Sequence, residues 1–177
     1  MRQEISVVWL KRDLRLHDHA ALNAAISDGV PVALLYVVEP DYWRLPDTSA
    51  RHWQFIRASL HELALEARTI GQSLTVRVGN VVDVLAGLSD QFNIVAIHAH
   101  EETGNLWTFK RDLDVLAWGR ANAVPIHEHR QFAVIRGKLD RDYWHHAWHD
   151  FFAPPPSGPA LFTHPTVNLD PGVIPDQ

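Results

Sequence analysis

The stretch VVWLKRDLRLHD, residues 7–18, joins a buried apolar strand to a dense group of charges. The apolar run Ile5–Leu10 stops abruptly at this group, a pattern typical of a strand buried on both faces of a parallel sheet. Asp18 can cap a following helix at residues 19–28, and a second apolar strand follows at residues 30–38. A strand, a helix and a strand in this order predict a right-handed parallel crossover.

Helices and strands keep alternating up to residue 135. The predicted elements are helices at residues 49–71, 81–88 and 103–122, and strands at residues 74–78, 93–99 and 124–128, with a loop at residues 42–47. Two helices have apolar residues at spacings of 3 and 4: Trp53, Ile56, Leu60, Leu63, Ala67 and Ile70 in one, and Leu106, Phe109, Leu113 and Leu116 in the other. The sequence therefore predicts an α/β fold: a doubly wound, mainly five-stranded parallel sheet, Rossmann-like, with helices on both faces.

Composition divides the chain into three parts. Residues 1–135 carry the α/β pattern. Residues 136–152 form an aromatic-rich extension with DRDYWHHAWHDFF, for which we expect a turn at Gly137 and a short helix against the outside of the sheet. Seven of the eleven prolines fall in residues 153–177, which predicts a linker or an extended tail.

Charge, cysteine count and motifs exclude several classes of function. A net charge of −5 without a run of like charge gives this chain alone no attraction to nucleic acid. The absence of cysteine excludes disulfides, thiolate metal sites and cysteine nucleophiles. No apolar run is long enough for a signal peptide or a membrane span, so we expect a cytoplasmic protein without a membrane partner. Neither a G-x-G-x-x-G fingerprint nor a P-loop is present, which argues against a dehydrogenase or a P-loop ATPase.

Polar side chains follow the predicted strands at their carboxyl ends, where open parallel sheets bind ligands. These residues are Lys11, Arg12, Asp13 and Arg15 after the first strand, Glu39 after the second, His100, Glu101 and Glu102 after the fourth, and Glu128 and His129 after the fifth. They predict a mixed-charge crevice for a flat, polar ligand. The equally weighted alternative is that these residues form ion pairs that only stabilise the loop. Trp43, after the second strand, is the candidate for stacking on a ligand ring.

The chain has twelve histidines, which raises the question of a metal site. His98 and His100, and likewise His127 and His129, are two residues apart on a predicted strand and share a face. Two such pairs would have to converge across strands, and no H-E-x-x-H helix accompanies them. Hydrogen-bonded or solvated histidines are the simpler interpretation, so we predict no metal site.

The segment VVWLKRDLRLHDHAALNAA, residues 7–25, resembles the start of DNA photolyases and cryptochromes, in which a strand precedes an R-D-L-R-x-x-D turn and a helix. Further similarity lies in PVALLYVVEP, RHWQFIRASLHEL, GQSLTVRVG, HEETGNLWTFKRDLDVLAWGRANAV and DYWHHAW, so the resemblance covers residues 5–152. It implies an N-terminal α/β domain with an antenna chromophore (a folate, a deazaflavin, a flavin or a lumazine). A helical domain that binds FAD and DNA follows in that family.

The resemblance also implies positions for the antenna crevice. The implied residues are Lys11, Arg12, Asp13, Arg15, Val38, Glu39, Glu101, Glu102 and Asn105. His100, from the strand-end pattern, and Trp43, as the stacking candidate, complete the set. Arg111 and Asp112 match an R-D of the family and imply either a structural salt bridge or a ligand contact.

Three functions follow from these observations. The first is the antenna domain of a deoxyribodipyrimidine photolyase, a carbon–carbon lyase that repairs UV-induced pyrimidine dimers; this chain alone would have no catalytic residue and be inactive. The second is the same domain of a cryptochrome-like blue-light receptor. In both, the expected partner is the helical FAD domain, and DNA binds through that domain only. The third is a stand-alone flavin- or nucleotide-binding module, which an ordered tail packed on the domain would favour.

Overall fold

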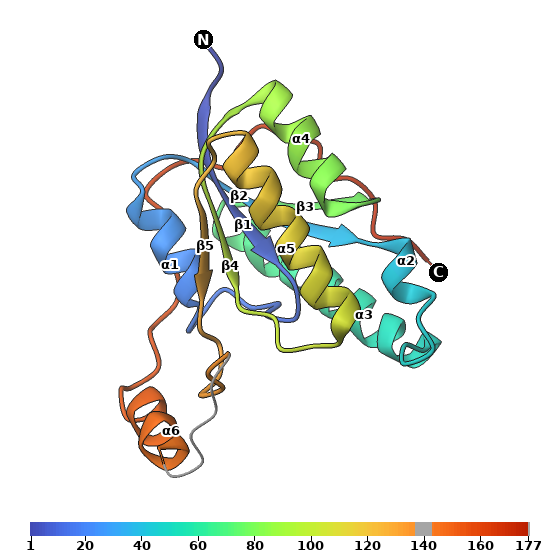
Figure 1. The fold of residues 1–177 in the computed structure, drawn as a ribbon. Helices are drawn as coiled ribbons and strands as arrows, with labels where there is room; N and C mark the ends of the chain where they lie inside the picture. Colours follow the sequence, from blue (N-terminus) through green and yellow to red (C-terminus); the bar gives the residue numbers. More distant parts are fainter. Residues whose placement is uncertain (137–142, 177) are drawn as a thin grey trace.

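A computed structural model describes residues 1–136 and 143–176, which contain one five-stranded parallel sheet (Figure 1). The strands are β1 (Glu4–Leu10), β2 (Val32–Val38), β3 (Leu74–Val78), β4 (Asn93–His100) and β5 (Ile126–His129). Their order is β3-β2-β1-β4-β5, so the chain moves outward from β1 in one direction and then returns to build the other half. The predicted fold class is confirmed, because this reversal at β1 defines a doubly wound sheet.

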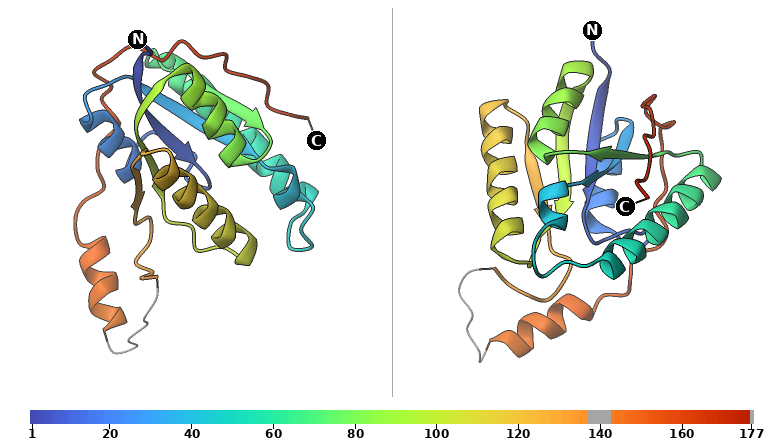
Figure 2. Two further views of the ribbon diagram at one scale, coloured as in Figure 1. Left: turned by 45° about the horizontal axis from the view of Figure 1, so that its top comes forward. Right: turned by 90° about the vertical axis from the view of Figure 1, so that its right-hand side faces the viewer.

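Helices cover both faces of the sheet (Figure 2). α1 (Ala20–Ser27) and α3 (Ala50–Thr69) cover one face, and α4 (Val81–Gln91) and α5 (Leu106–Ala121) cover the other. Strand residues alternate between the two resulting cores, so Val8 packs on the α1 and α3 side while Val7 packs on the α4 and α5 side. The α3 stripe predicted from sequence is confirmed for Trp53, Leu60, Leu63 and Ala67, which are all buried.

The start of α1 differs from the prediction. His19, rather than Asp18, is the N-cap, and its Nδ1 accepts the hydrogen bond from the N–H of Leu22. Asp18 has a φ of 48° and therefore belongs to the turn. Its Oδ1 instead accepts the N–H of Ser157, which belongs to the C-terminal segment. Asp18 thus fastens a distant part of the chain, a role that local pattern cannot reveal.

The predicted loop at residues 42–47 is also shorter than expected. Pro40–Trp43 forms one helical turn, α2, with Glu39 at its N-cap. Proline is favoured in the first turn of a helix, because its missing N–H would have no partner there. The turn matters because it sets Tyr42 and Trp43 against the end of the sheet.

α5 forms as predicted, but its apolar stripe faces away from the sheet. Its buried residues are Thr108, Asp112, Val115 and Gly119, whereas Leu106, Phe109 and Leu113 are exposed. Two inward contacts explain this orientation: Asp112 pairs with Lys11, and a Cβ on Gly119 would lie 2.5 Å from the Ile126 side chain. The polar and small face is therefore the one that fits the sheet.

The last part of the chain extends along the domain. α6 (Trp144–Phe152) lies beyond the carboxyl end of the sheet and buries only Ala147 in the described chain, so the expected packing against the outside of the sheet is wrong (Figure 1). Residues 153–176 then run as an ordered strap: Pro171 accepts the N–H of Val76 in β3, and Val167 is 3% exposed. The predicted turn at Gly137 lies outside the described residues. No described helix has the length and apolar character that crossing a membrane requires.

Candidate functional site

A pocket opens at the carboxyl ends of β1 and β2, between the α2–α3 segment and the first turns of α5. Its volume is about 540 Å³, within the usual range for small-molecule sites. The sheet positions the pocket, because strand order reverses at β1 and the crossovers on either side leave a space at that end.

One wall of the pocket is built on alternating charges. Lys11 Nζ lies 2.8 Å from Asp112 Oδ2, and Arg111 bridges Asp112 at 2.9 Å and Glu39 at 3.1 Å. Among the described residues, this network contains Lys11, Arg12, Arg111 and Arg136 with Glu39, Glu102, Asp112 and Glu128, and it is here called the charged wall. Because its four cations match its four carboxylates, the charged wall offers hydrogen-bond donors and acceptors without a net charge.

Burial shifts the pKa values in the charged wall. Burial lowers the pKa of Lys11 in spite of the neighbouring Asp112 carboxylate. Burial likewise raises the pKa of Glu39, although Arg111 acts in the other direction. For Arg111, burial would lower the pKa, but Asp112 and Glu39 outweigh it and the pKa is raised. Arg111 therefore stays a donor, while Glu39 gains proton affinity at the pocket surface.

Aromatic side chains make up much of the remaining lining. Trp9, at the end of β1, lies under two cations: its ring centroid is 4.3 Å from Lys11 Nζ and 4.8 Å from Arg111 Cζ. Trp43, at the end of α2, makes edge contacts with Tyr42 and Trp53 at centroid distances of 5.2 Å. A flat ring in the pocket would therefore meet aromatic surfaces beside polar ones.

A hydrogen bond between two loops spans the exposed side of the pocket. Asn105 Nδ2 donates to Asp47 Oδ2 at 2.7 Å, and Asn105 Oδ1 accepts the N–H of Thr108 and so caps α5. The preceding Gly104 has no room for a side chain, because a Cβ would lie 2.6 Å from Thr108 Oγ1. These contacts hold the start of α5 against the pocket.

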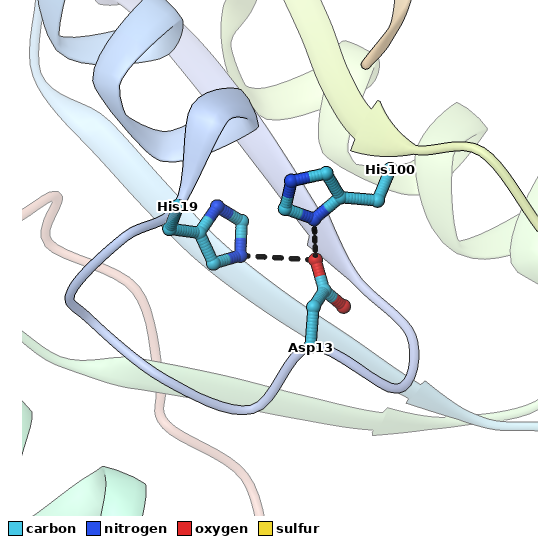
Figure 3. Close-up of side chains that lie close together, drawn as sticks. All are labelled: Asp13, His19 and His100. Carbon is cyan, nitrogen blue, oxygen red and sulfur yellow. Dashed lines mark hydrogen bonds and ion pairs between the residues drawn. The ribbon is translucent and has the colours of Figure 1, made fainter. Parts of the chain in front are cut away.

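A second polar group lies under α1, on the other side of the end of β1. In Figure 3 the Asp13 carboxylate points between two imidazole rings: its Oδ2 is 2.6 Å from His100 Nδ1 and 2.9 Å from His19 Nε2. All three side chains are buried, and Asp13 Oδ1 also accepts the N–H of Lys11. We call Asp13, His19 and His100 the Asp13 lock, because they join the end of β1, the start of α1 and the end of β4.

The tautomer of His19 argues against a metal ion in the Asp13 lock. Its three ligand atoms lie within 4.8 Å of one another, a spacing that a metal ion could use. However, His19 Nδ1 accepts the N–H of Leu22, so His19 Nε2 carries a hydrogen. This Nε2 lies 2.9 Å from Asp13 Oδ2 but without the geometry of a hydrogen bond. A metal would need the Nε2 lone pair and would force a hydrogen onto Nδ1, against that N–H. Burial would raise the pKa of Asp13, but His100 and His19 outweigh burial and lower it.

The histidines of β4 and β5 also meet under α1. His98 Nδ1 is 3.0 Å from His129 Nε2, and His98 Nε2 is 3.0 Å from Asp28 Oδ2 at the end of α1. The ring of His127 stacks on His98 at a centroid distance of 4.9 Å. Burial lowers the pKa of His98, and burial together with His98 lowers the pKa of His129 to about 4. The two strands thus bring His98, His127 and His129 together, with His98 hydrogen-bonded to His129 and Asp28.

Comparison with known proteins assigns the family. The family model described as DNA photolyase matches residues 6–136, which is most of the chain. The chain belongs to the DNA photolyase family. Its α/β fold corresponds to the N-terminal domain of photolyases and cryptochromes.

Two curated relatives show the degree of similarity. The blue-light photoreceptor PHR2 of Arabidopsis thaliana is 34% identical over 105 residues, which cover 56% of this chain and 24% of that protein. Cryptochrome DASH of Gloeobacter violaceus is 31% identical over 119 residues, which cover 64% of this chain and 24% of that protein. The photolyase-family chain described here thus spans about a quarter of the length of these relatives.

Two solved structures share the fold. A class III photolyase from Agrobacterium tumefaciens has a TM-score of 0.71 at 18% identity and covers 90% of this chain and 34% of its own. An archaeal photolyase from Sulfolobus tokodaii, described with two FAD molecules, has a TM-score of 0.69 at 20% identity and covers 92% of this chain and 38% of its own. At such identities the likeness extends to the fold only.

Part of the photolyase-family site predicted from sequence gathers around the pocket. The residues that line it are Lys11, Arg12, Glu39, Trp43, Glu102 and Asn105. Arg111 lines it too and is part of the salt-bridge network, so the structural alternative given for this residue is present. Whether these side chains contact a ligand stays a prediction.

The other predicted residues lie away from the pocket. Asp13 and His100 belong to the Asp13 lock, and Arg15 donates to the backbone carbonyls of His17 and Asp18. The remaining two predicted residues are Val38, which packs in the α1 and α3 core, and Glu101, whose N–H bonds to the carbonyl of His129. Tyr36 and Val37 line the pocket, whereas Val38 does not.

Sequence reasoning missed several pocket residues. They include Trp9, Tyr42, Asp47, Arg51 and Phe55. Trp9 could have been found, because it lies two residues before Lys11, where the charged turn begins. The other four come from α2, the following loop and the first turns of α3, and only the packing of this segment brings them to the end of the sheet.

Proposed function

We propose that this photolyase-family domain binds a light-harvesting antenna chromophore in the pocket at the carboxyl ends of β1 and β2. One observation carries the proposal: a single cavity of about 540 Å³ combines aromatic surfaces with the charged wall, whose cations and carboxylates balance. A flat heterocycle with donors and acceptors on its edge matches both features. Folates, deazaflavins, flavins and lumazines all have such a ring.

Individual residues have distinct tasks in this proposal. Trp43 offers aromatic surface to the ring, and Arg111 and Glu39 offer a donor and an acceptor to its polar edge. The Asp47–Asn105 hydrogen bond restricts the exposed side. When bound, the chromophore would supply the absorption of near-ultraviolet or blue light; this chain would bind and orient it.

For the larger protein we propose a deoxyribodipyrimidine photolyase. Excitation would pass from the antenna to FAD in a helical domain, which would also contact the DNA. A cryptochrome-like blue-light receptor is the second candidate, favoured by the names of the two curated relatives. A stand-alone flavin- or nucleotide-binding module is the third, favoured by the ordered strap that packs on the domain.

Chromophore titration tests the proposal. We expect the purified chain to bind at least one folate, deazaflavin, flavin or lumazine, with altered absorption and emission between about 300 and 500 nm, where such conjugated rings absorb. Trp43→Ala removes a stacking surface and should weaken binding about tenfold, roughly 1.4 kcal/mol. Trp148→Ala is the matched control, because Trp148 is exposed on α6 and does not line the pocket.

Two results would count against the pocket. Failure of every chromophore to bind would contradict the antenna role of this chain. Binding that Trp43→Ala and Asn105→Ala leave unchanged would place the chromophore elsewhere on the domain.

A further inference from the structure

The pocket changes in character from its inner end to its rim. At the inner end, Tyr36 of β2 is buried and Lys11 belongs to the charged wall. At the rim, the first turns of α3 contribute the exposed residues Arg51, His52 and Phe55. The starts of α3 and α5 lie at this same end of the sheet (Figure 1). A substituent of a bound ring that reaches solvent on this side would therefore pass the α3 residues.

The cations of the charged wall that line the pocket already have carboxylate partners. Lys11 and Arg111 both pair with Asp112, at 2.8 and 2.9 Å. Arg12 Nε lies 3.4 Å from Glu102 Oε1. An anion that approached these cations would also meet their carboxylates, so the attraction and the repulsion would largely cancel. The charged wall therefore suits an uncharged polar edge better than a charged group.

Arg51 differs from these cations because no carboxylate of the described chain pairs with it. Within residues 1–136 and 143–176, its guanidinium forms neither an ion pair nor a side-chain hydrogen bond. The rim carboxylate Asp47 accepts its hydrogen bond from Asn105 instead, at 2.7 Å. A guanidinium is planar, permanently charged and has five N–H donors, which match the oxygens of a phosphate or a carboxylate.

The orientation of α3 favours a binding role over simple solvation of Arg51. Exposed arginines are commonly solvated and contribute little. Here, however, the first two turns of α3 present a whole face to the cavity: Arg51 and Phe55 are one turn apart, and so are His52 and Ile56, and all four line the pocket. The free guanidinium thus belongs to the wall of a cavity.

We propose that the ligand of this pocket carries a phosphate or carboxylate group beside its ring, and that Arg51 binds this anion at the rim. The inference rests on the proposed antenna function, since the ring is the chromophore that we place in the pocket. It separates the candidate chromophores by their substituents. Flavin mononucleotide and folate carry such an anion, whereas riboflavin is uncharged. A charge-assisted hydrogen bond to Arg51 would favour the first two.

Two matched pairs of ligands test for the anion. Riboflavin and flavin mononucleotide share a ring and differ by one phosphate, and folate and its dimethyl ester differ by two ionised carboxylates. In fluorescence titrations at low salt, we expect the charged member of the pair that binds to have about five- to tenfold higher affinity, the range for a partly exposed charge-assisted contact. At about 0.5 M salt this preference should shrink, because salt screens exposed charges.

Substitutions test the residue. Arg51→Gln should remove the preference and leave the affinity for the uncharged member unchanged. Arg68→Gln is the matched control: it changes the net charge equally, and Arg68 is exposed in the last turn of the same helix and does not line the pocket. Asp47→Asn keeps an oxygen for Asn105 and removes a like charge, so it should increase the preference. Circular dichroism checks that the variants are folded.

The possible outcomes separate this inference from the antenna role. Equal affinity within the pair that binds would overturn the inference and leave the antenna role standing. A preference that Arg51→Gln does not reduce, or that Arg68→Gln reduces as much, would also overturn it. If neither pair binds, the inference is wrong, and titration with deazaflavins and lumazines decides separately whether the chain binds an antenna chromophore.

Discussion

Buried polar groups lie on both sides of the end of β1, and the two sets differ in whether they border a cavity. On the α1 side, the Asp13 lock and the pair His98 and His129 consist of hydrogen-bonded histidines and carboxylates. On the α5 side, the charged wall pairs lysine and arginine with carboxylates and borders the pocket. The first side joins backbone segments, whereas the second presents its groups to a cavity. Burial alone therefore does not separate the residues that could contact a ligand from those that only join segments, whereas access to the cavity does.

The largest effect should come from the α1 side. Asp13→Ala would remove the acceptor of the Lys11 N–H and leave His19 and His100 facing a cavity without a carboxylate. We expect the free energy of unfolding, measured by urea denaturation, to fall by about 3–5 kcal/mol. Asp41→Ala is the control, because the Asp41–Arg44 pair is exposed and should contribute less than about 0.5 kcal/mol. Similar losses in the two variants would contradict the lock.

A medium effect should follow from acidification. The folded-state pKa of His129 is lowered to about 4, whereas an unfolded histidine titrates near about 6.5, so the unfolded chain binds the proton first. Stability should therefore be lost as the pH falls from about 6.5 toward 4, by about 1–2 kcal/mol between pH 7 and 5.

Urea denaturation at pH 7, 6 and 5 measures this loss. His129→Asn should make the free energy of unfolding less dependent on pH, because it removes the group whose proton affinity differs between the folded and the unfolded chain. A variant with the same pH dependence as the unsubstituted chain would show that other groups control it.

The smallest effect on stability should come from the pocket side. The pKa of Glu39 is raised by burial, so its ionised form is not strongly favoured by the fold. Glu39→Gln keeps one oxygen that can accept from Arg111 but loses the acceptor of the Val81 N–H, so we expect the free energy of unfolding to fall by about 1 kcal/mol. The same variant should change chromophore affinity in the titration, because Glu39 lines the pocket. A large loss of stability with unchanged binding would reverse the contrast between the two sides.

The two long helices show which features the sequence pattern could predict and which it could not. Both have apolar residues at helical spacing, and both helices form. In α3 the stripe faces the core, but in α5 it faces solvent, because Asp112 and Gly119 fit the sheet better than Leu113 or Phe109. The apolar period identifies one face of a helix, but whether that face packs on the sheet or stays in solvent depends on elements elsewhere in the chain.

The candidate site could likewise be predicted only in part. The rule that ligands bind at the carboxyl ends of parallel strands led to Lys11, Arg12 and Glu39. It could not separate Glu39 from Asp13, since both are carboxylates close to a strand end. Asp47 and Phe55 were out of reach, because α2 and the loop after it must fold back before these residues approach the sheet.

The sequence by itself determined the order of elements, the parallel doubly wound sheet and the family, because these follow from local hydrophobic period and from contiguous motifs. Tertiary structure decided which strand-end residues border the pocket, how the histidines of β4 and β5 pair, and which face of α5 remains exposed. Those outcomes depend on contacts between residues far apart in the chain, such as Lys11 with Asp112 and Asp13 with His100. Side-chain direction at such contacts is set by packing, which no local pattern contains.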